Sequence, residues 1–163
     1  MGLLAVFLSV LALLALLLAW PAWRRAAEDP RYAAEVFDGL VPYDRVLASR
    51  RWNPPWANGW GCTYALVALN EAGPGTPGQR ETSVAGWEYA WGGEWLPTPA
   101  ARLGDATRDA MDACASHFDP DTAARLKAAL ATSGSWYVRD RVGETVHRYA
   151  PKHGIAARVR YGD

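Results

Sequence analysis

Nine tryptophans in 163 residues are the first side chains of this sequence that suggest binding chemistry. Six of them form two triplets with a spacing of four residues: Trp52, Trp56, Trp60, Trp87, Trp91 and Trp95. Exposed indole rings offer a large, rigid contact area for a sugar ring, a cation or a protein. Packing of irregular loops onto a small core is the commoner use of such residues. A ligand or partner surface is the binding hypothesis that the pattern offers.

Cys62 is a candidate nucleophile, because it begins an apolar stretch over 62–72 that the sequence predicts to be a helix. A thiol at a helix N-terminus lies at the positive end of the helix dipole, which favours the reactive thiolate. His147 follows later in the chain and could serve as its base. The alternatives are a buried structural cysteine and a disulfide with Cys114.

The string Gly59-Trp60-Gly61-Cys62 resembles the nucleophile region of the autophagy-related and ubiquitin-fold-modifier cysteine peptidases. This resemblance implies a thiol hydrolase with Cys62 as nucleophile. Those peptidases carry their histidine in an Asp-Pro-His string, whereas Asp119-Pro120 is followed here by Asp121. The chain also lacks the phosphate-loop, dinucleotide, zincin and serine-hydrolase motifs. We therefore expect no cofactor and no metal, and an enzyme is the less favoured class.

Basic side chains gather near the C-terminus and could form one surface: Arg139, Arg141, Arg148, Lys152, Arg158 and Arg160. Such a surface could meet anionic headgroups or an acidic partner, or could simply be solvated. The formal net charge of the whole chain is zero, so we expect no nucleic-acid partner.

Residues 3–20 form an uncharged apolar run. As a helix it would reach about 27 Å, close to the roughly 30 Å hydrocarbon core of a bilayer. No basic residue precedes it and the cleavage sites are poor, so a retained signal-anchor is favoured over a cleaved signal peptide. Arg24 and Arg25 follow, which favours a cytoplasmic domain and makes a disulfide less expected.

The elements expected after the anchor are mostly helical. Spacing and caps predict helices over 30–40, 43–49, 62–72, 99–118, 120–132 and 135–149, and strands over 87–91, 94–96 and 155–161. This gives a mainly helical α+β fold with a minor β element, made of a transmembrane helix (3–20), a juxtamembrane linker (21–31) and one globular domain (32–163).

The function expected from these features is docking of a protein partner by a small, Trp-rich, membrane-anchored domain. Such a protein could be an accessory subunit or assembly factor of a membrane complex, in contact with the lipid bilayer. The alternatives are a Trp-lined site for a glycan or small molecule, and a thiol hydrolase built on Cys62.

Overall fold

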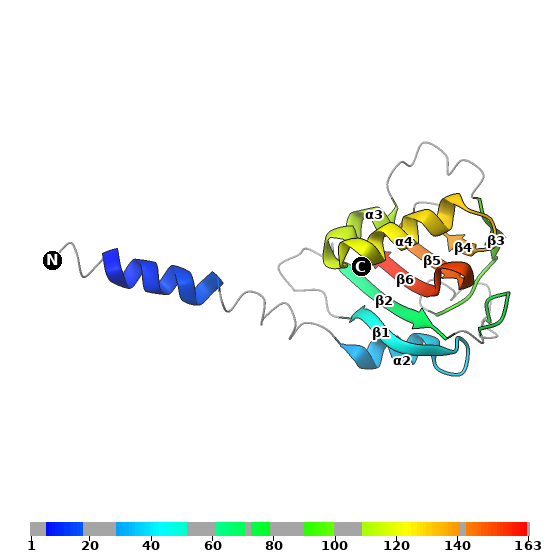
Figure 1. Ribbon diagram of the computed structural model, residues 1–163, viewed down its shortest axis with the longest axis horizontal. Coiled ribbons are helices and arrows are strands. Elements are labelled where there is room, and N and C mark those ends of the chain that lie inside the picture. Colours follow the sequence, from blue (N-terminus) through cyan, green and yellow to red (C-terminus); the bar gives the residue numbers. More distant parts are fainter. Residues whose placement is uncertain are drawn as a thin grey trace.

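The computed structural model describes residues 6–17, 29–51, 61–70, 73–78, 90–99, 109–140 and 143–162. Its centre is a six-stranded antiparallel sheet with the strand order β1-β2-β6-β5-β4-β3 (Figure 1). The strands are β1 (Tyr43–Arg50), β2 (Cys62–Leu69), β3 (Leu96–Pro97), β4 (Trp136–Arg139), β5 (Thr145–Ala150) and β6 (Ile155–Tyr161). The helices after the N-terminal one are α2 (Pro30–Phe37), α3 (Ala110–Cys114) and α4 (Pro120–Ala131), with 3-10 turns η3 (Ala115–His117) and η4 (Pro151–His153).

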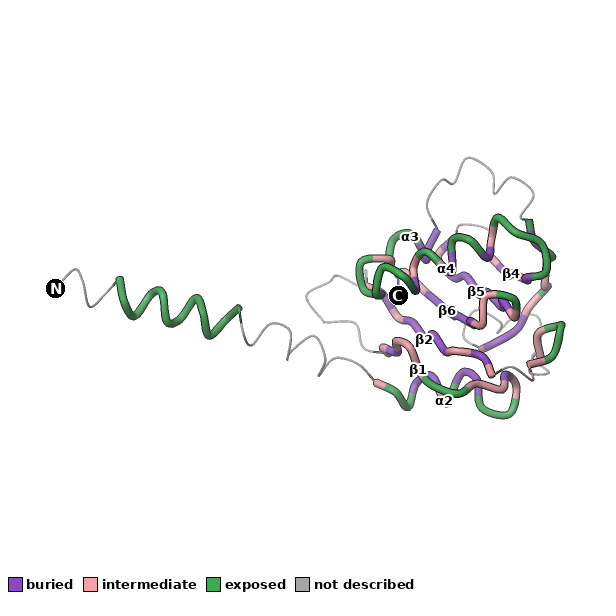
Figure 2. The backbone as a smooth tube through the Cα atoms, viewed as in Figure 1, coloured by how far each residue is buried: buried purple, intermediate pink, exposed green. Residues whose placement is uncertain are grey.

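The last strand of the chain lies between two earlier ones. β6 pairs with β2 from Ala68↔Ile155 to Cys62↔Tyr161, and on its other side it pairs with β5. Every side chain of β5 and the first five of β6 are buried. Figure 2 shows these central strands as the most buried part of the molecule.

Helices cover both faces of the sheet. On one face, α3 and α4 pack over β5 and β6 around a core that includes Leu66, Met111 and Val159. On the other face, α2 packs over β1 and β2 around a core that includes Phe37, Trp91 and Tyr149. The central strands are therefore buried on both sides.

Two helices begin where the sequence predicted a start signal. Asp29 caps α2 by accepting a hydrogen bond from the Arg31 amide at 3.1 Å, with Pro30 in the first turn. Asp119 caps α4 by accepting from the Thr122 amide at 3.0 Å, ahead of Pro120. These predicted helices and the predicted strand over 155–161 are confirmed.

The prediction of a mainly helical fold with a minor β element is wrong, because three predicted helices are strands. Residues 43–49 lie in β1, residues 62–69 form β2, and residues 136–139 and 145–150 form the hairpin β4–β5. For β2 the reason is burial on both faces, because such a strand carries a continuous apolar run rather than an alternating one, and its sequence resembles that of a buried helix.

Residues 6–17 are helical, and their side chains are exposed. Among the described residues, no helix has both the length and the apolarity needed to cross a bilayer. This finding contradicts the predicted transmembrane anchor at 3–20, the single-pass topology and the membrane localisation. Residues 3–5, 18–20 and most of the predicted linker lie outside the described residues.

Candidate functional site

The predicted tryptophan surface is only partly described. Trp52, Trp56, Trp60 and Trp87 lie outside the described residues. Trp91 is 1% exposed, packs edge-on against Phe37 at 4.9 Å between ring centroids, and lies 5.0 Å from the half-buried Trp95. Trp91 is therefore part of the core beneath α2 rather than an exposed platform.

Cys62 lies in β2 and forms a disulfide with Cys114 of α3, with the two Cα atoms 5.7 Å apart. The sequence offered this disulfide as one alternative, and the predicted cytoplasmic topology made it less expected. Because Cys62 is in a strand and its sulfur is bonded, neither the helix dipole nor a free thiolate is available for nucleophilic catalysis.

His147 lies on the opposite face of the sheet from Cys62, stacked on Trp91 with 5.4 Å between ring centroids. Its Nδ1 is 2.9 Å from the Gly92 carbonyl oxygen. Burial, assisted by the positive charge of Arg158, lowers the pKa of His147 to about 3 against the effect of that backbone contact. His147 is thus a neutral core residue, and the structure does not bring it to Cys62.

The predicted basic surface is divided by the sheet. Arg148 and Arg158 are buried, Arg139 and Arg160 are half-buried, and Lys152 is exposed, while Arg141 lies outside the described residues. Arg148 faces α3 and α4, whereas Arg158 faces α2. These residues do not form one continuous surface.

The structure reveals a cavity of about 440 Å³ between α3 and α4. Its lining is mainly apolar, and it includes four charged side chains. The apolar lining consists of Met111, Ala115, Phe118, Ala123, Ala124, Leu126 and Leu130. The charged lining consists of Asp109, Asp112, Lys127 and Arg148.

Arg148 connects the two helical walls of this cavity to the sheet. Its Nη1 donates to the Leu126 carbonyl oxygen of α4 at 2.9 Å, and its Nη2 donates to Asp109 Oδ2 at 3.1 Å. The buried Nε–H finds no hydrogen-bond partner among the described residues. Burial lowers the pKa of Arg148, and the carboxylates of Asp109 and Asp112 oppose that shift. The guanidinium keeps its charge, because arginine is not deprotonated in proteins.

Asp109 uses both of its carboxylate oxygens. While Oδ2 accepts from Arg148, Oδ1 accepts from the amides of Met111 at 2.9 Å and Asp112 at 3.3 Å, which caps α3. The ion pair is buried, with 7% of the Arg148 side chain and 5% of the Asp109 side chain exposed. Asp109 therefore holds both the first turn of α3 and the arginine beneath it.

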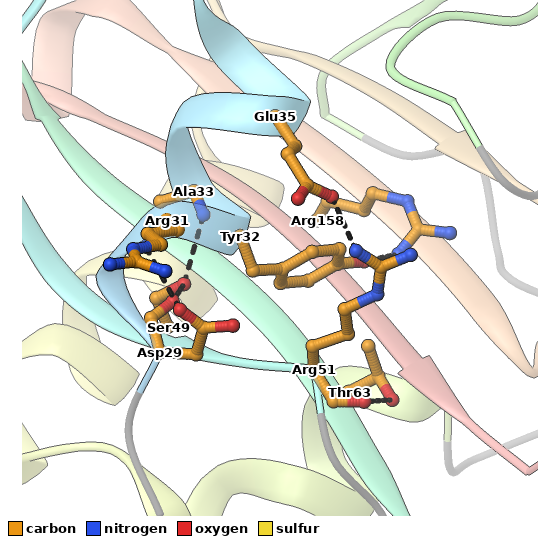
Figure 3. A network of polar contacts seen from close by, with 9 residues as sticks. All are labelled: Asp29, Arg31, Tyr32, Ala33, Glu35, Ser49, Arg51, Thr63 and Arg158. Carbon is orange, nitrogen blue, oxygen red and sulfur yellow. Dashed lines mark hydrogen bonds and ion pairs between the residues drawn. The ribbon is translucent and has the colours of Figure 1, made fainter.

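A second polar cluster lies on the α2 face, and Figure 3 shows its side chains. Arg158 donates to the Tyr32 hydroxyl, and its guanidinium carbon lies 6.0 Å from the centroid of the same ring. Arg51 forms an exposed ion pair with Glu35 at 2.7 Å and also lies 6.0 Å from the Tyr32 ring. Burial raises the pKa of Tyr32, and the positive charges of Arg158 and Arg51 oppose that shift.

Sequence reasoning missed Asp109 and the cavity. The available signal was the acidic side chain just before the apolar stripe that includes Met111 and Cys114, which is the pattern of an N-cap. Arg148 was singled out, but as a surface residue. Arg148 is buried next to Asp109, which lies 39 positions earlier in the chain.

The fold and the site define a class of protein: an antiparallel sheet with helices on both faces. Between α3 and α4 lies a cavity that is mainly apolar and includes four charged side chains. The described residues contain no group of three or more side chains able to hold a metal ion. Comparison of the chain with protein-family models, with curated proteins and with solved structures finds no match.

Proposed function

We propose that this domain binds a small, mainly apolar molecule in the cavity between α3 and α4. The observation that carries the proposal is the cavity itself, whose lining is mainly apolar and includes the buried ion pair of Arg148 and Asp109.

The size and lining of the cavity support this function. A volume of about 440 Å³ falls within the range of small-molecule sites, which are mostly apolar with a few placed polar groups. Here Met111, Phe118 and Leu126 supply buried apolar surface.

A disulfide and hydrogen bonds, in addition to packing, hold the walls of the cavity in place. The Cys62–Cys114 bond joins α3 to β2, and Arg148 joins β5 to the backbone of α4. A site whose walls are already ordered loses less conformational entropy when a ligand binds. The disulfide and the ion pair thus support binding by a pre-formed pocket.

Chemical-shift mapping of the ¹⁵N-labelled full-length protein tests this function, with acetophenone as the probe. We expect saturable shifts at Ala115, Phe118 and Leu130, which line the cavity. The variant Ala123→Phe fills the cavity and should weaken binding by ten-fold or more. The control Ala128→Phe places the same ring on an exposed position of α4 outside the lining, and should bind as the native protein does. Equal binding by both variants would refute the proposal.

The disulfide also supports a working environment other than the one expected from the sequence. Disulfides persist in oxidising compartments and are rare in the cytosol. We therefore propose that the folded domain works outside the reducing cytosol. Alkylation of the protein in intact producing cells, followed by mass measurement, should show both cysteines protected until a reductant is added. Two alkylated cysteines without reductant would contradict this.

Docking of a protein partner and contact with the lipid bilayer stay predictions of the sequence. Four of the six tryptophans invoked for docking lie outside the described residues, and Trp91 is buried. The described geometry therefore favours the cavity.

A further inference from the structure

We infer that the cavity selects an amphipathic zwitterion, such as an apolar amino acid, with its ammonium group at Asp112 of α3 and its carboxylate at Lys127 of α4. This inference rests on the proposed function and names the ligand class for the same site. It follows from the charges that the lining presents to solvent, and the buried ion pair supplies no contact to the ligand.

Asp112 and Lys127 are the two charged lining side chains that a ligand can reach. Both line the cavity and both are exposed, so they lie where the cavity opens to solvent. The other two charged side chains of the lining, Asp109 and Arg148, are only 5% and 7% exposed and are paired with each other. The polar end of a ligand would therefore meet Asp112 and Lys127.

These two exposed side chains come from different helices and are not paired with each other. Asp112 lies in the first turn of α3, whereas Lys127 lies in α4. Within the part of the chain that the structure describes, no ion pair joins them or ties either of them to another residue. Each side chain is therefore open to a ligand group of the opposite charge.

The α3 side of the cavity has an excess of negative charge. Asp109 caps α3 and Asp112 lies in its first turn, and the guanidinium of Arg148 lies beneath them. Both carboxylates stabilise the charged form of Arg148, so Asp112 also lies near this guanidinium. Two negative charges and one positive charge leave one negative charge in excess. Because only Asp112 of the three is exposed, a ligand ammonium is attracted there.

The α4 side of the cavity has a single positive charge. Lys127 is the one charged side chain that α4 contributes to the described lining, and its other contributions are apolar: Ala123, Ala124, Leu126 and Leu130. A ligand carboxylate would meet Lys127 there without a competing carboxylate from the lining residues of the same helix.

Opposite charges on the two sides favour a ligand that carries both signs. A ligand with one charge would be attracted to one helix and would leave the charge on the other helix without a partner. Between the two sides, Phe118 and Leu126 are buried and offer apolar surface to the side chain of the ligand. An apolar body with a zwitterionic end thus matches the apolar base and the charged opening of the cavity.

Four probes that share a phenyl ring test this inference in the ¹⁵N-labelled full-length protein at pH 7. Phenylalanine and 3-amino-3-phenylpropanoate are zwitterions that differ in the spacing of their charges, phenethylamine is a cation, and 3-phenylpropanoate is an anion. We expect the tighter-binding zwitterion to bind about three-fold more tightly than either ion, because each exposed charge contact contributes modestly. Added sodium chloride should reduce this preference, since salt screens exposed charges.

Two variants remove the charges one at a time. Asp112→Asn should abolish the preference over 3-phenylpropanoate, because the ammonium group loses its partner, and should keep the preference over phenethylamine. Lys127→Gln should do the reverse. The controls Asp121→Asn and Lys152→Gln change exposed charges outside the cavity lining and should retain both preferences.

The outcomes distinguish the two levels of the proposal. If neither acetophenone nor any of the four probes moves the cavity resonances, the proposed function itself is wrong. If acetophenone binds but neither zwitterion binds more tightly than both ions, the site exists and the inferred ligand class is wrong. The same conclusion follows if Asp112→Asn and Lys127→Gln keep both preferences.

Discussion

The two faces of the sheet each bury an arginine, and the two side chains are held in different ways. Arg148 of β5 lies opposite Ala157 of β6, and Arg158 follows directly after Ala157 in the chain. Arg148 is paired with the carboxylate of Asp109, whereas Arg158 donates to the neutral hydroxyl of Tyr32 and lies near its ring. Neighbouring arginines thus have a charged partner on one face and an aromatic partner on the other.

A counter-ion lies beside the charge of Arg148, since its Nη2 is 3.1 Å from Asp109 Oδ2. The charge of Arg158 acts on its surroundings, since it helps to keep His147 neutral and opposes the rise in the pKa of Tyr32. The ion pair of Arg148 therefore bears on the stability of the α3 face, whereas the charge of Arg158 bears on the titration of His147 and Tyr32 on the α2 face.

Removing the carboxylate on the α3 face should give the largest effect. In Asp109→Asn the cap of α3 can remain, but Arg148 is left as an uncompensated buried charge. We expect a loss of about 3 to 5 kcal/mol in the free energy of unfolding, measured with urea. The control Asp112→Asn changes an exposed carboxylate and should stay within about 0.5 kcal/mol of the native protein. A loss below about 1 kcal/mol for Asp109→Asn would show that the pair is not buried as described.

The disulfide ties only the α3 face of the sheet, because the chain has two cysteines in all. The double variant Cys62→Ala and Cys114→Ala should lose about 2 to 4 kcal/mol of unfolding free energy, since the bond closes a loop with a sequence separation of 52. Acetophenone should also bind this variant more weakly, because α3 forms one wall of the cavity. Dithiothreitol should destabilise the native protein and leave the double variant unchanged; equal sensitivity would contradict the assignment.

On the α2 face the expected effect depends on pH. The pKa of His147 is lowered to about 3 in the folded protein, below its usual value of 6.5. Between these values the unfolded chain binds a proton that the folded chain does not, so stability falls as the pH falls. From pH 7 to pH 5 this residue should account for a loss of about 2 kcal/mol in the free energy of unfolding.

The variant His147→Gln measures this contribution. It should lower stability at pH 7, because stacking on Trp91 is lost, but its stability should decrease less between pH 7 and pH 5 than that of the native protein. An unchanged pH profile in His147→Gln would mean that folding does not lower the pKa of His147.

A smaller effect should come from the partner of Arg158. Tyr32→Phe removes the hydroxyl that accepts from Arg158 but keeps the ring, and should cost about 1 kcal/mol of unfolding free energy. Arg51→Gln breaks the exposed ion pair with Glu35 and should cost less, because such pairs contribute little in water. If Tyr32→Phe cost as much as Asp109→Asn, the contrast between the two faces would be lost.

Sequence reasoning succeeded where the signal is local. Asp29-Pro30 and Asp119-Pro120 each combine a capping carboxylate with a proline in the first turn, and both helices begin there. It failed on β2 and on the β4–β5 hairpin. Val138 and Val146 are eight positions apart, a spacing that also fits a helix, but they lie on adjacent strands of the hairpin.

The cavity could not be predicted from such local signals. Asp109 lies 39 positions before Arg148, and Cys62 lies 52 positions before Cys114. The chain contains no local feature that distinguishes Asp109 from the other acidic residues, or that shows whether its two cysteines come close enough to bond. The sequence did single out Arg148, but an isolated arginine is more often exposed than buried.

The sequence by itself determined the starts of α2 and α4 and the last strand, because caps, prolines and short-range patterns act within a few residues. Only the tertiary structure decided that the apolar run after Cys62 is a central strand, that Cys62 is bonded to Cys114, and that Arg148 is buried at a cavity. Each of these depends on which distant segments cover which face of the sheet. Burial on both faces removes the alternation from which a strand is normally recognised, and pairing across the sheet assigns the partners.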